Sequence, residues 1–344
     1  MRRLSYDRKD LGYSFALTTF TMLVASLALG VFFRDDSGWR FWVIQTINTS
    51  LIGGSAFLYS AMAQTNVIVA TKLNKRPILS HVLWGCAGVV CLFFCMNQIN
   101  VLFFDAIESS GLNRPSTNVP NDLVGRIICA CVLPAFAEEI VFRGTIAQTV
   151  YNHKSKLAAL AISGALFSLF HASPAQTLHQ FVFGCFLTLL VYRSGSLWTS
   201  VIVHFFNNAL VIVSAYTPLA YENFWRFDTN KWALPLMIVG IVGFAVCVFL
   251  YVKTTKSNWL RERDQKVVKT QEIKQNSVES VFEEEQDGQA SESVEETAEG
   301  EEVADESNEE LEERESRLEK ITYDAPLWVG IFVFVALWIA QLLR

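Results

Sequence analysis

Several signatures of metal-binding proteins are missing from this sequence of 344 residues. It has no HExxH motif and no comparable short zinc spacing, and no CxxC pair occurs with a second copy. These absences exclude the common zinc sites that can be recognised from spacing alone. All seven cysteines fall in apolar stretches, where we expect them to pack as small apolar residues: Cys86, Cys91, Cys95, Cys129, Cys131, Cys185 and Cys247.

The chain also lacks an internal repeat and any lipidation or retention signal. The missing repeat disfavours transporters built from inverted repeats. Charge is distributed unevenly, because residues 278–320 hold 19 acidic against 3 basic residues, a net charge of −16 in a chain whose total is −6. Such a segment cannot bury enough apolar surface to fold alone. We expect a solvated linker there, with a docking tail for a basic partner as the alternative.

Apolar residues are abundant instead. The chain is 51% hydrophobic, contains 26 Phe and has a mean hydropathy of +0.29, which is typical of a polytopic membrane protein. Nine segments approach the length of about 20 residues that a membrane-crossing helix needs. We therefore predict an all-α transmembrane bundle of about eight or nine helices, at residues 11–33, 41–63, 78–104, 123–150, 157–172, 177–192, 197–216, 232–252 and 326–343.

Basic residues fall mainly on alternate connections between these segments. Because positive residues are retained on the cytoplasmic side, this pattern predicts a multi-pass protein of the cell membrane, with the N-terminus and the acidic insert in the cytoplasm. The lack of sorting signals favours a bacterial inner membrane. The basic residues on the predicted cytoplasmic side are Arg2, Arg3, Arg8, Lys9, Lys72, Lys75, Arg76, Lys154, Lys156, Arg193, Lys253, Lys256, Arg261 and Arg263.

The pattern divides the chain into five parts. Residues 1–122 are expected to hold about three transmembrane helices, 123–216 a core of four helices that carries the polar motifs, and 217–253 a further helix. Residues 254–323 form the acidic insert, and 324–344 a C-terminal transmembrane helix.

Two adjacent carboxylates, Glu138 and Glu139, lie in the middle of an apolar segment. Ionisable groups at membrane depth are costly and rare, so they indicate a functional site. Glu139 and Arg143 are four residues apart and share a helix face, whereas Glu138 points about 100° away from Glu139. We therefore expect Arg143 to neutralise Glu139 and to leave Glu138 as the reactive carboxylate.

Two further pairs with the same spacing occur in later segments: Phe167 with His171, and His204 with Asn208. Depth counted at 1.5 Å per residue places Glu138, both histidines and Asn208 roughly in one layer. A carboxylate, two imidazoles and an amide supply what amide hydrolysis requires, namely a base for water, donors for the oxyanion and a proton for the leaving amine.

The same residues leave a metal as an open alternative. Glu138, His171 and His204 could hold a divalent ion such as zinc that activates water. The missing short zinc spacing, and the weak zinc affinity of an asparagine, favour catalysis without a cofactor.

The three motifs, Glu138-Glu139-x3-Arg143, Phe167-x3-His171 and His204-x3-Asn208, resemble in their order those of the CPBP intramembrane proteases, also called the ABI family. That family includes the Rce1-type CAAX proteases and the bacteriocin-processing and self-immunity proteins. The resemblance covers residues 123–216. It includes Arg143-Gly144 and the turn Arg193-Ser-Gly-Ser196.

The resemblance implies a glutamate-dependent intramembrane protease with a conical central cavity. By position, Glu138 would activate water, His171 would bind or orient it, and His204 and Asn208 would stabilise the oxyanion. Glu139, Arg143 and Phe167 would support them. The implied partners are membrane lipids and a membrane-associated or lipidated protein or peptide substrate, with no nucleic acid.

Other interpretations predict different properties. Cleavage of prenylated CAAX proteins is a second specificity, since eukaryotic members of the family trim three residues after a prenylated cysteine. A bacteriocin self-immunity protein or a non-catalytic scaffold would use the polar cluster only to hold helices together. A proton-coupled transporter would use it as a proton relay, and would show repeats and broken helices.

Overall fold

The computed structural model describes residues 2–32, 38–110, 122–153, 156–220, 222–257 and 324–341. Helices dominate these residues, and the only β-type contact among them is an isolated bridge between Arg3 and Thr65. The all-α fold class is therefore confirmed. The predicted acidic insert, apart from residues 254–257, lies outside the described residues, and so does its expected basic partner site.

All nine predicted spans correspond to helical segments. They are α1 (Asp10–Phe32), α2 (Gly38–Met62), α4 (Leu79–Ser109), a continuous helical run over residues 123–153, α8 (Lys156–Phe170), α9 (Thr177–Ser194), α10 (Leu197–Ser214), α12 (Ala233–Thr254) and the C-terminal helix (Asp324–Gln341). Short helices α3 (Val67–Ala70) and α11 (Glu222–Trp225) lie in connections.

Five of the described helices are long and apolar enough to cross a membrane by length and composition: α1, α4, α10, α12 and the C-terminal helix. Helix α8 is apolar but has only 15 residues, a rise of about 22 Å at 1.5 Å per residue. The described residues therefore contain five candidate membrane spans, and the nine predicted segments are confirmed as helices.

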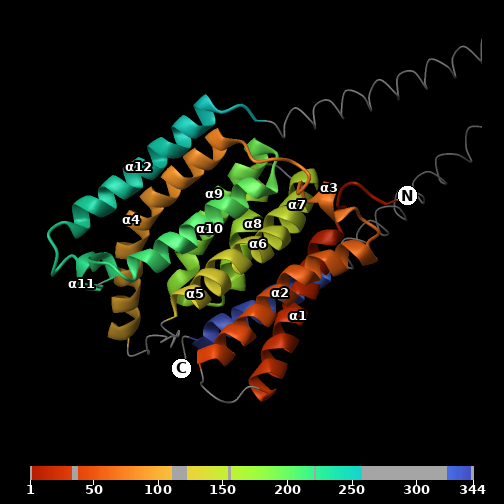
Figure 1. The fold of residues 1–344 in the computed structure, drawn as a ribbon, viewed down its shortest axis with the longest axis horizontal. Coiled ribbons are helices and arrows are strands. Elements are labelled where there is room, and N and C mark those ends of the chain that lie inside the picture. The colour runs from red at the N-terminus through yellow and green to blue at the C-terminus, as the bar shows by residue number, and fades with distance from the viewer. Residues whose placement is uncertain are drawn as a thin grey trace, which may run out of the picture.

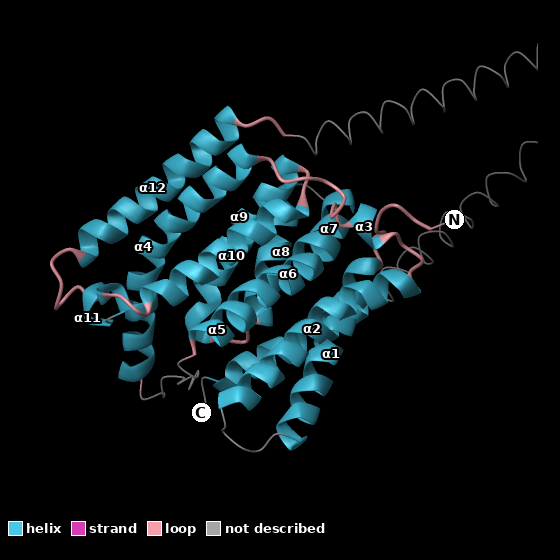
Figure 2. Cartoon of the chain, in the orientation of Figure 1, coloured by secondary structure: helices cyan, strands magenta, loops and turns pink. Residues whose placement is uncertain are grey.

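The helices form a bundle with the motif-bearing helices in its middle (Figure 1). Helices α4 and α12 pack together along one edge, and α4 also contacts α9 and α10. Helices α1 and α2 pair along the opposite edge, where α2 contacts α6 (Leu133–Glu139). Short loops join most of the helices (Figure 2). The polar motifs are therefore enclosed by helices from both ends of the chain.

Close packing holds α12 against α4. A Cβ atom at Gly240 would lie 2.7 Å from the backbone nitrogen of Cys95, so only glycine permits this approach. At the other end of the pair, Nδ1 of His81 lies 2.8 Å from the Tyr251 hydroxyl. This partner of His81 could not be predicted from the sequence, because the two residues are 170 positions apart.

The helical run over residues 123–153 departs from regular α geometry. It comprises α5 (Leu123–Arg126), the π-helical segment η1 (Ile127–Val132), α6 (Leu133–Glu139), the π-helical segment η2 (Ile140–Ile146) and α7 (Ala147–His153). Pro134 at the start of α6 has no N–H to donate, which interrupts the regular i to i−4 ladder. The span predicted at residues 123–150 is therefore helical, but wider π turns lie on both sides of the glutamates. Such π turns are frequent at functional sites.

Candidate active site

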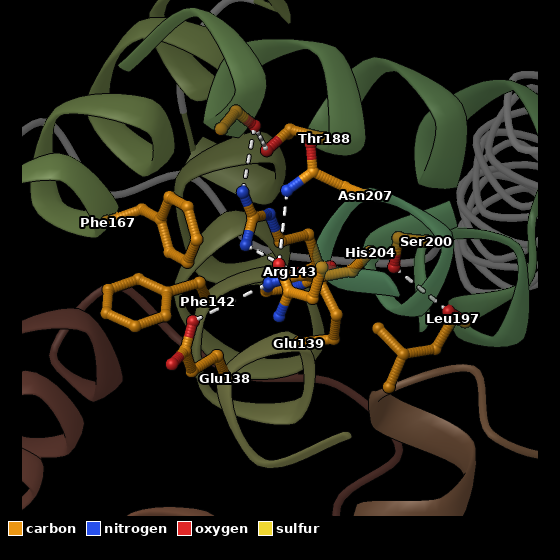
Figure 3. Close-up of polar contacts among 12 residues, drawn as sticks. Glu138, Glu139, Phe142, Arg143, Phe167, Thr188, Leu197, Ser200, His204 and Asn207 are labelled. Atoms are coloured by element: carbon orange, nitrogen blue, oxygen red, sulfur yellow. Dashed lines mark hydrogen bonds and ion pairs between the residues drawn. The ribbon is translucent and has the colours of Figure 1, made fainter. Parts of the chain in front are cut away.

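Glu138 and Glu139 are the last two residues of α6, just before η2. The Glu139 side chain is fully buried, whereas that of Glu138 keeps 14% of its surface exposed. Figure 3 shows Glu139 beside Arg143 and His204, and Glu138 nearer to the ring of Phe142. The two adjacent carboxylates thus have different surroundings, as their positions on the helix predict.

Glu139 belongs to a buried network of charges. Its Oε1 accepts a hydrogen bond from Nη1 of Arg143 at 2.7 Å and lies 2.8 Å from Nδ1 of His204. Arg143 is also fully buried, and its Nη2 donates to the Gly184 carbonyl at 3.2 Å. The ion pair predicted from the four-residue spacing therefore forms, and it extends to α9 and α10.

Gly184 contributes to this network through its lack of a side chain. A Cβ atom there would lie 2.9 Å from the Cα atom of Gly164 and 3.3 Å from Nη2 of Arg143. The sequence analysis missed Gly184, although small residues facing each other in two apolar helices are a signal of close helix approach.

The ring of Phe167 lies beneath the polar groups. Its centroid is 4.7 Å from that of His171 and 5.9 Å from that of His204, both edge-on. The guanidinium carbon of Arg143 lies 4.1 Å from the same centroid, within cation–π distance. Phe183 also packs edge-on to His204, with the ring centroids 5.4 Å apart. Phe167 thus supports both imidazoles, which agrees with its predicted position.

Glu138 faces both histidines without touching either. Its Oε2 lies 3.8 Å from Nε2 of His171 and 3.9 Å from Nε2 of His204, which is too far for direct hydrogen bonds. This oxygen is buried and has no hydrogen-bond partner among the described residues. The structure therefore brings Glu138, His171 and His204 together around one point.

The Nδ1 atom of each imidazole, which is the ring nitrogen not facing Glu138, already has a hydrogen-bond partner. Nδ1 of His171 lies 2.8 Å from the Phe167 carbonyl, which can only accept, so Nδ1 carries a proton. In neutral His171 the Nε2 atom therefore presents a lone pair toward Glu138. Nδ1 of His204 donates in the same way to the Glu139 carboxylate. Oε2 of Glu138 and the Nε2 atoms of neutral His171 and His204 are therefore three hydrogen-bond acceptors that face one another. A hydrogen-bond donor between them would satisfy them.

Comparison with known proteins agrees with this arrangement. Residues 120–210 match the family described as type II CAAX prenyl endopeptidase Rce1-like. The chain is also 24% identical over 149 residues to a Bacillus subtilis (strain 168) protein named "Putative membrane peptidase YdiL". That similarity covers 42% of this chain and 61% of the relative, so the chain spans less than two thirds of that relative's length. No solved structure matches the chain significantly.

Residues 120–210 thus form an Rce1-like region by this match. All seven predicted site residues lie in this Rce1-like region: Glu138, Glu139, Arg143, Phe167, His171, His204 and Asn208. Helices α1, α2, α4 and α12 and the C-terminal helix lie outside it, so the relationship accounts for the motif-bearing helices and not for those around them.

The three acceptor atoms of the Rce1-like region do not fit a tetrahedral zinc ion. Two ligand atoms at zinc bond lengths of 2.0–2.1 Å would be about 3.3 Å apart, which is closer than either measured separation. No group of three His, Cys, Asp or Glu residues in the described part of the chain has the geometry of a metal site. The geometry therefore favours the metal-free alternative.

Asn208 bonds to the helical run that carries the glutamates. Its Nδ2 donates to the Ala130 carbonyl at 2.9 Å. In a regular α-helix that carbonyl would accept from residue 134, but Pro134 has no N–H. The neighbouring Asn207 is buried and donates from Nδ2 to Oδ1 of Asn208 at 3.1 Å. Both amides therefore help to satisfy the irregular helix that carries the glutamates.

Replacing Asn208 with Ala should lower the free energy of unfolding by about 1 kcal/mol, because the Ala130 carbonyl loses its donor. Pro134→Ala restores a backbone donor four residues beyond Ala130, so the Asn208→Ala change should cost less in that background. Denaturant titration of the four variants in detergent measures both effects. If Asn208→Ala lowered the free energy of unfolding by the same amount in the wild-type and the Pro134→Ala backgrounds, this role of Asn208 would be contradicted.

Proposed function

We propose that the chain is an intramembrane endopeptidase that hydrolyses a peptide bond with water activated by Glu138. The observation that carries this proposal is the unsatisfied, buried Oε2 of Glu138, which faces the Nε2 atoms of His171 and His204 at 3.8 and 3.9 Å. The match of residues 120–210 to the Rce1-like family supports peptide hydrolysis as the reaction class.

A water molecule between Glu138 and His171 would satisfy both groups. A separation of 3.8 Å is too long for a direct bond and short enough for two acceptors to share one donor molecule. The water would donate one hydrogen to Oε2 of Glu138 and the other to Nε2 of His171. Glu138 would then take the proton as the water oxygen attacks the substrate carbonyl carbon, and would later pass it to the leaving amine.

His204 would act on the oxyanion that this attack creates. Its Nδ1 is bonded to Glu139, and this role requires that Nε2 first takes up a proton from solvent, which would place an imidazolium beside that carboxylate. That Nε2–H would donate to the oxyanion. The second hydrogen on Nδ2 of Asn208 would be a further donor, since only one of the two is used by Ala130 in the bonds described.

Limited exposure of the reactive groups fits a site inside the membrane. The side chains of Glu138 and His171 keep 14% and 19% of their surfaces exposed, so a substrate could reach them, whereas Glu139 and Arg143 are fully buried. We propose that the conical cavity expected from the family opens at this point. A low exposure also limits the entry of bulk water.

Contacts between connections support the proposed orientation. The Arg3 amide donates to the Gln64 carbonyl, the Ser196 hydroxyl to the Lys75 carbonyl, and Nε of Arg193 to the Thr255 hydroxyl. The basic connections therefore gather at one end of the bundle, which would face the cytoplasm of a bacterial inner membrane. The substrate would be a membrane-associated peptide or protein, with a prenylated CAAX protein as the second specificity.

Cleavage by the purified protein tests this function. The full-length chain in detergent would be incubated with a panel of membrane-anchored, lipidated and prenylated peptides, and the products identified by mass spectrometry. We expect cleavage at one defined peptide bond in at least one of these three classes of peptide. Absence of cleavage throughout the panel, with proton-driven solute uptake in liposomes, would instead establish the transporter interpretation.

Removal of divalent metal should leave this activity unchanged, because the acceptor atoms do not fit zinc. We expect the cleavage rate after dialysis against a strong chelator to stay within about twofold of the untreated rate, since a zinc that activates water would be indispensable. Metal content is measured in the same sample. Loss of activity that zinc restores would show that the site closes around a metal.

A further inference from the structure

The C-terminal helix packs beside the active site although it lies outside the Rce1-like region. Near its start, Asp324 pairs with Arg8 at 3.3 Å. Gly330 is buried, and a Cβ atom there would lie 2.7 Å from the ring of Phe15 on α1. The remaining turns run along α1 toward the ends of α8 and α9, behind α1 and α2 in Figure 1, where this helix is blue.

Phe334 connects this helix to the catalytic residues. It is fully buried, and its ring centroid lies 5.7 Å from that of Phe15 and 5.3 Å from that of Phe170. Phe170 directly precedes His171 and also packs on Phe142 in η2, at 5.2 Å. A continuous row of aromatic rings therefore runs from the C-terminal helix to the segment that follows the glutamates.

Trp338 makes the second connection. Its Nε1 donates to the Thr177 hydroxyl at 2.8 Å, and that hydroxyl donates to the Ser173 carbonyl at 2.9 Å. The Thr177 carbonyl accepts from the Ser168 hydroxyl at 2.6 Å. Trp338 therefore holds the turn between α8 and α9, and the bonded residues lie on both sides of His171.

The turn held in this way contains a strained residue. Ala172, directly after His171, has a φ of 45°, in the left-handed region that residues with a Cβ atom rarely adopt. Glycine occupies this region without penalty. Strain of this kind persists only where the surroundings hold the backbone in place, and it is frequent at active sites.

We propose that Phe334 and Trp338 are positioning residues, which keep the strained turn closed and so fix Nε2 of His171 toward Glu138. This inference rests on the proposed function for its effect on rate. Under this inference the C-terminal helix is needed for full catalytic activity, although the family match ends at residue 210.

The test uses the full-length chain with Trp338→Phe, which removes the donor and keeps an aromatic ring. We expect kcat to fall about tenfold with KM nearly unchanged, because a small displacement of a catalytic group costs this much. Trp328→Phe on the same helix is the matched control, since Trp328 is 65% exposed, and it should retain the wild-type kcat. Ala172→Gly should restore most of the activity to Trp338→Phe, because glycine holds the turn without strain.

Amide hydrogen exchange of the peptide spanning residues 168–177 gives a second readout that does not depend on cleavage. We expect faster exchange in Trp338→Phe than in wild type or Trp328→Phe, and slower exchange again after Ala172→Gly is added. Equal kcat and equal exchange in Trp338→Phe and wild type would overturn the inference. Faster exchange in a chain whose wild type cleaves nothing would support the positioning contact and refute the proposed function.

Discussion

Replacing Glu138 with Gln lowers kcat by about 10²- to 10⁴-fold, the usual contribution of a positioned general base. Glutamine keeps the size and the hydrogen-bonding shape of the side chain, but its amide cannot take a proton from water. The side chain is 14% exposed and makes no direct bond to His171 or His204, so the fold should be unaffected. The measurement is steady-state cleavage of the peptide class found with the wild-type protein.

Glu108→Gln is the control for this variant, since Glu108 is exposed near the end of α4 and takes no part in the mechanism. It should keep the wild-type rate. The thermal unfolding midpoint of Glu138→Gln in detergent should equal that of the wild type. A Glu138→Gln protein that is folded and cleaves at more than about a tenth of the wild-type rate would refute its role as the base.

Removing Arg143 has the largest expected effect on stability. Arg143 and Glu139 are both fully buried and 2.7 Å apart, so Arg143→Met leaves a buried carboxylate without its guanidinium partner. Breaking a buried ion pair by removing one partner costs about 3–5 kcal/mol. We expect a loss of this size in the free energy of unfolding, measured by denaturant titration in detergent.

The double variant Glu139→Gln with Arg143→Met separates charge from packing. It contains no buried unpaired charge, so it should recover most of the stability lost in Arg143→Met. It should remain poorly active, because Nδ1 of His204 loses the carboxylate that stabilises its imidazolium. If the single variant were as stable as the wild type, Glu139 would have to be neutral in the folded protein.

Helices and motif pairs could be predicted from the sequence because both depend on local spacing. The apolar runs identified the long helices of the described residues, and the four-residue spacing of Glu139 and Arg143 identified an ion pair that the structure contains. The convergence of Glu138, His171 and His204 followed from their similar depth in the membrane. Their roles in catalysis stay predictions.

Contacts between distant segments, and departures from regular geometry, could not be predicted. The π turns on both sides of α6 have no signal in the apolar pattern, and the bond from Asn208 to Ala130 joins residues 78 positions apart. Phe334 packs on Phe170 and Trp338 bonds to Thr177, and each of these pairs is more than 160 positions apart in the chain. The periodicity of a single sequence contains no information about contacts between residues so far apart in the chain.

The most direct test of the account is a high-resolution experimental structure of the wild-type protein in lipid, with diffraction data collected at the zinc absorption edge. The account predicts a water molecule at about 2.6–3.2 Å from both Oε2 of Glu138 and Nε2 of His171, with no anomalous signal at that position. An anomalous peak between these atoms, or a direct hydrogen bond from His171 to Glu138 that leaves no place for water, would contradict activation of water by Glu138 alone.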